Sequence, residues 1–177
     1  GRRFAARGRH VQRVLSDQEP WRRNRQSRFR GVVAMVAAIV LAAGAGSRFG
    51  GPKQALLLPE VLRRVRESSV DDVIVVTGAH PLETDARVVN CPEWELGPGG
   101  SLRCGLAELG DDVEAAVVVL ADGPDLSPAA VDRVVAAWRG GAGEIVAASY
   151  GGDRGHPVAI GRSVWNRIPD EGARGLE

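Results

Sequence analysis

Four short apolar runs constrain the fold of this chain more than any other feature of its sequence. They cover residues 36–41, 73–77, 116–120 and 145–148. Each run is apolar at almost every position, whereas a strand with one face in water would alternate apolar and polar residues. Segments with helical patterning lie between and after the runs, at 60–68, 101–109 and 127–139. This alternation predicts a doubly wound α/β fold with a mostly parallel sheet.

The last helical segment and the chain that follows it carry boundary signals. Ser127 stands where a helix N-cap is expected, Pro128 suits the first turn, and Gly140 suits the end. Farther along, "EIVAAS" and "HPVAI" flank the turn-rich "YGGDRG". Two apolar segments around such a turn predict a hairpin that is added to the sheet near the C-terminus.

The charge of the chain is divided unevenly between its start and the rest. Residues 1–30 hold ten arginines against two acidic residues, a net charge of +8, so the remainder carries −7 within a total of +1. A length of 177 residues and a hydrophobic content of 44% fit one globular domain. We therefore expect a basic, poorly ordered extension over residues 1–30 and an acidic domain over residues 31–177. An acidic domain favours no specific nucleic-acid partner.

Two features bear on the compartment of the protein. An arginine-rich start followed by "VVAMVAAIVLAAGAG" imitates an export signal, but the run is too short to cross a membrane, and cleavage near Gly46 would remove the first predicted strand. Cys91 and Cys104 lie thirteen residues apart without a CxxC motif, which implies neither a zinc site nor a disulfide framework. We therefore expect a protein of the reduced cytoplasm, with no membrane partner, in which Cys104 packs as a small apolar residue.

A glycine-rich loop follows the first predicted strand directly and invites comparison with known phosphate-binding loops. The Walker A pattern fails because a proline separates its second glycine from Lys53 and no Ser or Thr follows. The dinucleotide pattern GxGxxG begins at Gly44 and Gly46 but has Phe49 at its third glycine position. A dinucleotide site stays open as the second interpretation of the loop.

The chemistry of the loop still favours a polyphosphate. Glycines let backbone N–H groups approach an anion closely, and Arg48 and Lys53 add positive charge beside them. Asp122 follows the third apolar run, so it is expected at the carboxyl end of a central strand, where open α/β sheets bind ligands. A carboxylate there can hold Mg²⁺, which completes its shell with phosphate oxygens and water. These residues predict a magnesium-dependent phosphate site.

Four pieces of the sequence together resemble the MobA-like NTP transferase family. They are "LAAGAGSRFGGPK" (41–53), "NCPEWELGPGGSLRCGL" (90–106), "VVVLADGPDLSP" (117–128), and "RGHPVAIGRSVW" with "PDEGAR" (154–174). The resemblance implies a Rossmann-like nucleotidyltransferase fold and an enzyme that transfers NMP from an NTP to a phosphorylated acceptor and releases pyrophosphate. Because "LAAG" resembles the cytidylyl branch more than the guanylyl branch, it also implies CTP as donor and molybdopterin as acceptor, in molybdenum cofactor biosynthesis.

The resemblance assigns roles to individual residues. The positions that it implies for the nucleotide are Leu41, Ala42, Ala43, Gly44, Gly46, Ser47, Gly100, Ser101 and Gly105. Arg48 and Lys53 match the catalytic arginine and lysine of the family, and Asp122 matches its metal-binding aspartate. On the acceptor side, Asp170 matches a contact position, and His156 is interpreted either as an acceptor contact or as a structural residue.

The chain departs from the family pattern in two places. We expect a short deletion after residue 59, which would remove part of the helix behind the glycine loop, and a truncation at the C-terminus, after "GAR". Both departures put activity in question. Two alternatives to the transferase therefore stay open: an NAD(P)H-dependent oxidoreductase of the same family, and a non-catalytic nucleotide-binding protein.

Overall fold

A sheet of seven strands runs through the computed structural model, which describes residues 13–15, 34–44 and 53–176. The strands are β1 (Arg13–Leu15), β2 (Met35–Ala42), β3 (Asp72–Thr77), β4 (Arg87–Asn90), β5 (Val113–Leu120), β6 (Ile145–Tyr150) and β7 (Asp153–Gly161). Their spatial order is β1-β6-β7-β5-β2-β3-β4, with β7 antiparallel to both of its neighbours and every other pair parallel. The predicted mostly parallel α/β sheet is confirmed.

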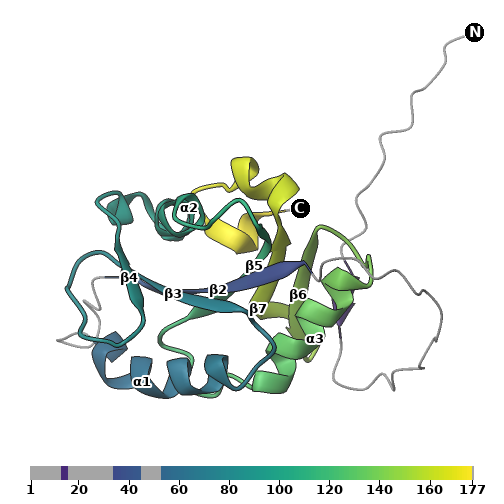
Figure 1. The fold of residues 1–177 in the computed structure, drawn as a ribbon, viewed down its shortest axis with the longest axis horizontal. Coiled ribbons are helices and arrows are strands. Elements are labelled where there is room, and N and C mark those ends of the chain that lie inside the picture. Colours follow the sequence, from purple (N-terminus) through teal and green to yellow (C-terminus); the bar gives the residue numbers. More distant parts are fainter. Residues whose placement is uncertain (1–12, 16–33, 45–52, 177) are drawn as a thin grey trace, which may run out of the picture.

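Helices cover both faces of this sheet (Figure 1). On one face lie α1 (Lys53–Arg66) and α3 (Pro128–Arg139). On the other lie α2 (Pro98–Ala107) and three 3₁₀ turns, η2 (Trp94–Leu96), η3 (Arg162–Arg167) and η4 (Gly172–Gly175). Each face has its own cluster of buried apolar side chains, and successive residues of β2 alternate between the two clusters. The central strands are therefore buried on both sides, as their continuous apolar runs predict.

The hairpin expected near the C-terminus is present and extends the sheet. β6 and β7 pair with each other, and β7 also pairs with β5 through Val118 and Val158. The hairpin thus joins the parallel strands through β7. Because β7 runs against β5, its first residues lie at the edge of the sheet where β5 ends.

The first helix begins earlier than the sequence indicates. We predicted a helix over residues 60–68, but α1 runs from Lys53 to Arg66 and contains Pro59. A proline removes one backbone donor and normally interrupts a helix. Four buried residues spaced at i, i+3, i+4 and i+7 offset this cost: Leu58, Val61, Leu62 and Val65. The helix is therefore continuous through a proline that lies one residue before the predicted start.

Two strands were not predicted. β4 has mostly exposed side chains and forms by pairing with β3, and β1 lies within the segment interpreted as a basic extension and pairs with β6. Neither has a long apolar run of its own. For α3 the predicted boundaries are confirmed, since Ser127 and Gly140 flank it, although the Ser127 side chain makes no capping hydrogen bond.

A correction concerns the cysteines. Cys91 and Cys104 form a disulfide with their Cα atoms 5.7 Å apart, so the expectation of two separate thiols was wrong. The bond joins the residue after β4 to the last turn of α2, which tertiary packing brings together. Because the two cysteines are bonded to each other, they no longer support the expectation of a reduced compartment. Within the described ranges, no helix is long and apolar enough to cross a membrane.

Candidate active site

The strand order reverses between β2 and β5. After β2 the chain builds β3 and β4 outward on one side, and it then returns to place β5 on the other side of β2. Open α/β sheets bind ligands at such a reversal, beyond the carboxyl ends of the two strands. The residues that follow β2 and β5 are the predicted loop residues and Asp122. The topology therefore brings two predicted parts of the site to one edge.

Asp122 lies at this edge with an exposed side chain. Leu120, the last residue of β5, pairs with Leu41 of β2, and the Ala121 N–H donates to the Leu41 carbonyl at 3.0 Å. The Gly123 N–H donates to the Leu120 carbonyl at 3.2 Å, which turns the chain around Asp122. These bonds hold the backbone on both sides of the carboxylate while its side chain stays open to solvent.

The residues after β2 are held by a second set of contacts. Ala42 and Ala43 are buried, and the Ala43 carbonyl accepts a hydrogen bond from the Ala79 N–H at 3.1 Å. Gly44 is exposed. Three loops thus converge where β2, β3 and β5 end. Of the other predicted loop residues, Gly46, Ser47 and Arg48 lie outside the described residues, and Lys53 is the first residue of α1.

The amino end of α2 is the second predicted nucleotide segment, and neighbouring segments cover it in this structure. Gly100 and Ser101 are buried. A Cβ added to Gly100 would lie 2.6 Å from the Glu93 carbonyl oxygen, and one added to Gly99 would lie 1.8 Å from the Pro169 oxygen. The helix end is therefore packed between η2 and the segment before η4. Only glycine therefore fits at positions 99 and 100.

Gly105 has a packing explanation that the sequence did not reveal. It lies on the side of α2 that faces the sheet, where an added Cβ would come within 2.8 Å of Val76 Cγ2 and 3.0 Å of Ile39 Cγ2. Gly105 thus allows α2 to approach β2 and β3 closely. A contact between Gly105 and a nucleotide finds no support in this position.

The two residues predicted for the acceptor side lie on different segments. His156 is half-buried in β7, two residues before Val158, so it lies at the edge where β5 ends. Asp170 is exposed in the segment before η4, and its carboxylate accepts a hydrogen bond from Arg103 Nη2 at 2.9 Å. The structure brings Asp170 to the amino end of α2.

Two arginines at this edge were missed by the sequence reasoning. Arg103 also donates to the Ile168 carbonyl at 3.0 Å. Arg154 donates to the carbonyls of Leu176 at 2.8 Å and Ala173 at 3.1 Å, and burial lowers its pKa. Both lie inside the sequence pieces that carry the family resemblance, but no charge pattern singled them out. Their partners are far away in the chain.

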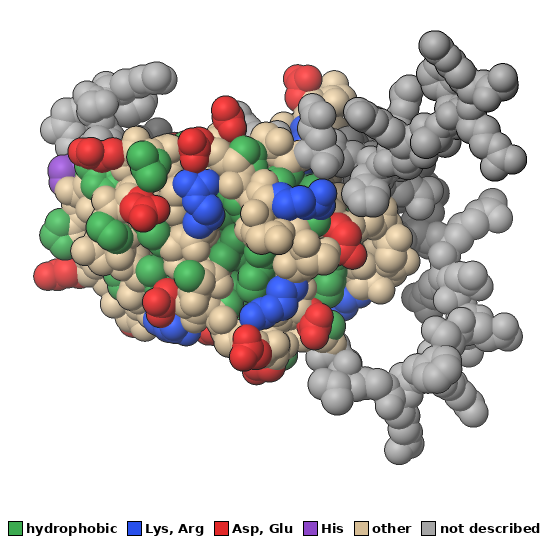
Figure 2. Space-filling view, turned by 90° about the horizontal axis from the view of Figure 1, so that it is seen from above, with side chains coloured by type: hydrophobic (Ala, Val, Ile, Leu, Met, Phe, Trp, Pro, Cys, Tyr) green, Lys and Arg blue, Asp and Glu red, His purple; other side chains and the backbone are tan. Residues whose placement is uncertain are grey.

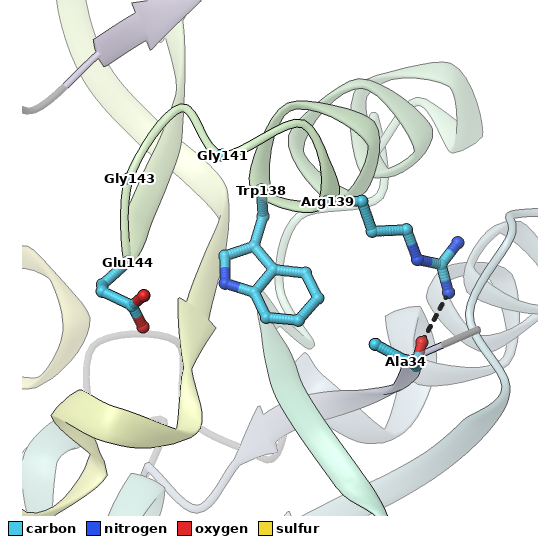
Figure 3. Close-up of a pocket in the computed structure, with 6 residues that line it drawn as sticks. All are labelled: Ala34, Trp138, Arg139, Gly141, Gly143 and Glu144. Atoms are coloured by element: carbon cyan, nitrogen blue, oxygen red, sulfur yellow. Dashed lines mark hydrogen bonds between the residues drawn. The ribbon is translucent and has the colours of Figure 1, made fainter. Parts of the chain in front are cut away.

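A pocket of about 450 Å³ lies at the opposite edge of the sheet (Figure 3). It is lined by Ala34, Trp138, Arg139, Gly141, Gly143 and Glu144. Its charged groups already have partners in the protein: Arg139 donates to the Ala34 carbonyl at 3.0 Å, and Glu144 accepts a bond from Ser163. This pocket lies at the amino end of β2 and apart from the predicted residues.

The surface on the α2 side carries charges of both signs. On the described part of this face, acidic and basic side chains are interspersed and no extended patch of one sign is visible (Figure 2). Apolar side chains lie between them. The described residues of this face therefore form no cluster of positive charge of the kind that is typical of a nucleic-acid-binding surface.

Comparisons with known proteins place the chain in a family. Residues 38–176 match the model of the MobA-like NTP transferase domain. Nicotine blue oxidoreductase from Paenarthrobacter nicotinovorans is 32% identical over 147 residues, which cover 71% of this chain and 70% of that protein.

Solved structures share the fold. Rv0371c from Mycobacterium tuberculosis H37Rv matches with a TM-score of 0.64 and 30% identity, over 77% of this chain and 76% of that chain. The complex of Rv0371c with manganese matches with a TM-score of 0.60 and 28% identity, over 75% of this chain and 74% of that chain. Mth528, a nucleotidyl transferase from Methanothermobacter, matches with a TM-score of 0.61 and 24% identity, over 77% of this chain and 76% of that chain. The resemblance seen in four pieces of sequence is confirmed, and this chain belongs to the MobA-like NTP transferase family of nucleotidyltransferases.

Proposed function

We propose that this protein transfers CMP from CTP to a phosphorylated acceptor, with molybdopterin as the best candidate, and releases pyrophosphate. The observation that carries the proposal is the position of Asp122, which stands beside the end of β2 at the reversal of strand order. Family membership supports the reaction class. The opening "LAAG" of the glycine loop supports CTP, and the same resemblance supports a role in molybdenum cofactor biosynthesis. We also propose a cytoplasmic location, because the apolar run near the start is too short to cross a membrane and cleavage near Gly46 would remove β2.

The proposed reaction needs no covalent intermediate with the enzyme. An oxygen of the acceptor phosphate attacks the α-phosphorus of the nucleotide and forms a new P–O bond. The bond from that phosphorus to the bridging oxygen breaks, and pyrophosphate leaves with the electron pair. In this proposal Arg48, Lys53 and the N–H groups of the loop after Ala43 stabilise the negative charge that develops on the phosphates. The acceptor phosphate is already ionised at neutral pH, so little base catalysis is required.

The residues at this edge fit a hard divalent cation. Asp122 offers an exposed carboxylate, which is a ligand that Mg²⁺ prefers, and nucleotide phosphates and water would supply the remaining oxygens. No group of three or more His, Cys, Asp or Glu that could hold a metal lies within the described ranges. When bound, the cation would neutralise phosphate charge. The manganese complex of Rv0371c supports a divalent cation in the family.

A second candidate function is an NAD(P)H-dependent oxidoreductase. The similarity to nicotine blue oxidoreductase favours it, because 32% identity extends over most of both chains. The incomplete dinucleotide pattern of the loop weighs against it, since Phe49 replaces the third glycine. The transferase therefore stays the first proposal, and the two make opposite predictions for ligand binding.

Thermal denaturation of the full chain with CTP, GTP, ATP, UTP or NADPH, each with and without Mg²⁺, tests both candidates. A ligand at one hundred times its dissociation constant stabilises the folded state by about 2.7 kcal/mol. We expect a Mg²⁺-dependent shift with CTP that is lost in Asp122→Ala and reduced in Lys53→Ala. Asp125→Ala is the matched control, because Asp125 is also exposed in the same loop.

Pyrophosphate release then tests the reaction itself. With CTP and molybdopterin, we expect release from the wild type and from Asp125→Ala, and none from Asp122→Ala. A shift with NADPH alone would favour the oxidoreductase. Nucleotide binding without pyrophosphate release from any acceptor would favour a non-catalytic protein.

A further inference from the structure

Three hydrogen bonds join the first six residues of α2 to the segment before η4. Arg103 donates to the Ile168 carbonyl through Nη1 at 3.0 Å and to Asp170 Oδ1 through Nη2 at 2.9 Å. The Gly99 N–H donates to the Asp170 carbonyl at 2.9 Å. Two residues of α2, one turn apart, therefore hold Ile168 and Asp170, in a segment about seventy positions later in the chain.

The geometry of this junction depends on the guanidinium group. A planar guanidinium presents two donors in a fixed fork, so one side chain fixes a carbonyl and a carboxylate together. The Arg103 side chain is 35% exposed and the Asp170 side chain 71%, so the ion pair alone contributes little. The junction also contains the close approach of Gly99 to Pro169, which leaves no space for the segment to slide.

The same segment is held at its other end by β7. Arg154 donates to the Ala173 and Leu176 carbonyls, and it lies two residues before His156 in the strand. Hydrogen bonds thus connect α2, which carries Gly100 and Ser101, through residues 168–176 to the strand that carries the proposed acceptor residue His156.

We propose that Arg103 is a positioning residue that couples the nucleotide side of the site to the acceptor side. The inference rests on the proposed function, because it requires both substrates to bind at this edge. Nucleotide bound against the segments that cover the amino end of α2 would fix that helix end, and the Arg103 bonds would carry the constraint to residues 168–176. Coupling of this kind is reciprocal, so the acceptor tightens nucleotide binding by the same factor.

Arg87, the first residue of β4, provides a matched control because it contacts the other end of the same helix. It donates to the carbonyl of Glu108 at 2.8 Å and to its carboxylate at 3.1 Å, just beyond the far end of α2. Like Arg103, it joins one guanidinium to one carbonyl and one carboxylate. Its contacts lead away from residues 168–176, so its removal tests whether any loss of support for α2 has the same effect.

The experiment measures the dissociation constant of molybdopterin with and without a saturating, non-reacting CTP analogue and Mg²⁺. In the wild type we expect the analogue to tighten molybdopterin binding by about fivefold or more. In Arg103→Ala the factor should fall to near one while binding of the analogue alone is retained. Arg103→Lys keeps the charge but loses the fork, so it should restore only part of the factor. Arg87→Ala should keep the wild-type factor.

Hydrogen exchange gives a readout that does not need the acceptor. CTP with Mg²⁺ should slow amide exchange in residues 168–176 of the wild type and of Arg87→Ala, but not of Arg103→Ala. The coupling role would be overturned if the CTP analogue tightened molybdopterin binding in Arg103→Ala as much as in the wild type. It would also be overturned if Arg87→Ala lost this tightening to the same extent as Arg103→Ala. Protection of α2 without protection of residues 168–176 in the wild type would overturn this role alone, whereas failure of every nucleotide to bind would overturn the proposed function with it.

Discussion

The N–H of Ala121 donates to the carbonyl of Leu41 at 3.0 Å, so the chain leaves β2 and β5 at the same level of the sheet. The bond sets the distance between the start of the glycine loop and Asp122 without using the carboxylate itself. The aspartate is therefore free to serve a ligand, and its removal should leave the backbone arrangement intact.

We expect Asp122→Asn to abolish Mg²⁺-dependent nucleotidyl transfer without loss of stability. The side chain is exposed, and substitutions at exposed positions away from special contacts change the free energy of unfolding by only about 0.5 kcal/mol. Chemical denaturation and pyrophosphate release measured on the same samples check the two parts. Wild-type activity in a folded Asp122→Asn protein would remove this residue from the proposed site.

The exposed face of α1 provides a prediction about pH. Hydrogen bonds from Arg63 and then Arg64 lower the pKa of Glu60 from 4.5 to about 2. A lowered carboxyl pKa stabilises the folded state above the unfolded pKa, so this contribution is complete above about pH 4.5 and is lost as the pH falls toward 2. An NMR titration of the Glu60 carboxyl carbon should report the lowered value.

Two variants test the cause of this shift. Arg63→Gln should raise the pKa of Glu60 more than Arg64→Gln does, because Arg63 donates two hydrogen bonds to this carboxylate and Arg64 donates one. Salt should also raise it, since exposed charges are screened. A wild-type value near 4.5 at low salt would contradict the contacts described for α1.

The sequence predicted those parts of the fold whose signals are local. Continuous apolar runs identified the central strands, and Ser127, Pro128 and Gly140 marked the bounds of α3. Asp122 was expected at the end of a strand, and it lies there. In each case the pattern and the structure involve neighbouring residues, so no knowledge of the tertiary fold was needed.

The remaining features depend on contacts between distant segments. We predicted that the first helix starts at residue 60, but burial of Leu58 and Val61 on the sheet keeps α1 continuous through Pro59. The mostly exposed β4 exists because β3 offers it a free edge. The disulfide and the Arg103–Asp170 pair likewise join segments that are far apart in the chain and meet only in the folded structure. No local pattern distinguishes such residues.

The contact between Gly99 and Pro169 predicts a large effect from a small substitution. In Gly99→Ala the new methyl group would lie 1.8 Å from the Pro169 carbonyl oxygen and 2.8 Å from the Asp170 Cα, so the segment before η4 must move. Overpacking of this kind lowers the free energy of unfolding by about 1–3 kcal/mol. Denaturation in urea measures the loss.

Gly123→Ala is the control for this substitution. Its added Cβ would meet only the Leu120 carbonyl oxygen at 3.5 Å, which is an ordinary contact distance. We expect its unfolding midpoint to stay close to that of the wild type. Equal midpoints for Gly99→Ala and the wild type would show that the α2 end is not packed as described.

The disulfide between Cys91 and Cys104 provides the last prediction. A bond that closes a loop of about fifteen residues stabilises the folded state by about 3 kcal/mol, chiefly by restricting the unfolded chain. Reduction with a phosphine should therefore lower the melting temperature of the wild type, with intact mass spectrometry confirming two free thiols. The double variant Cys91→Ala/Cys104→Ala should melt at the same temperature with and without the phosphine. Because Cys91 is fully buried, we expect reduction to require local opening of the last turn of α2 and to be slow in the native protein. An unchanged melting temperature after complete reduction would mean that packing of α2 on the sheet, and not the covalent bond, holds this end of the site together.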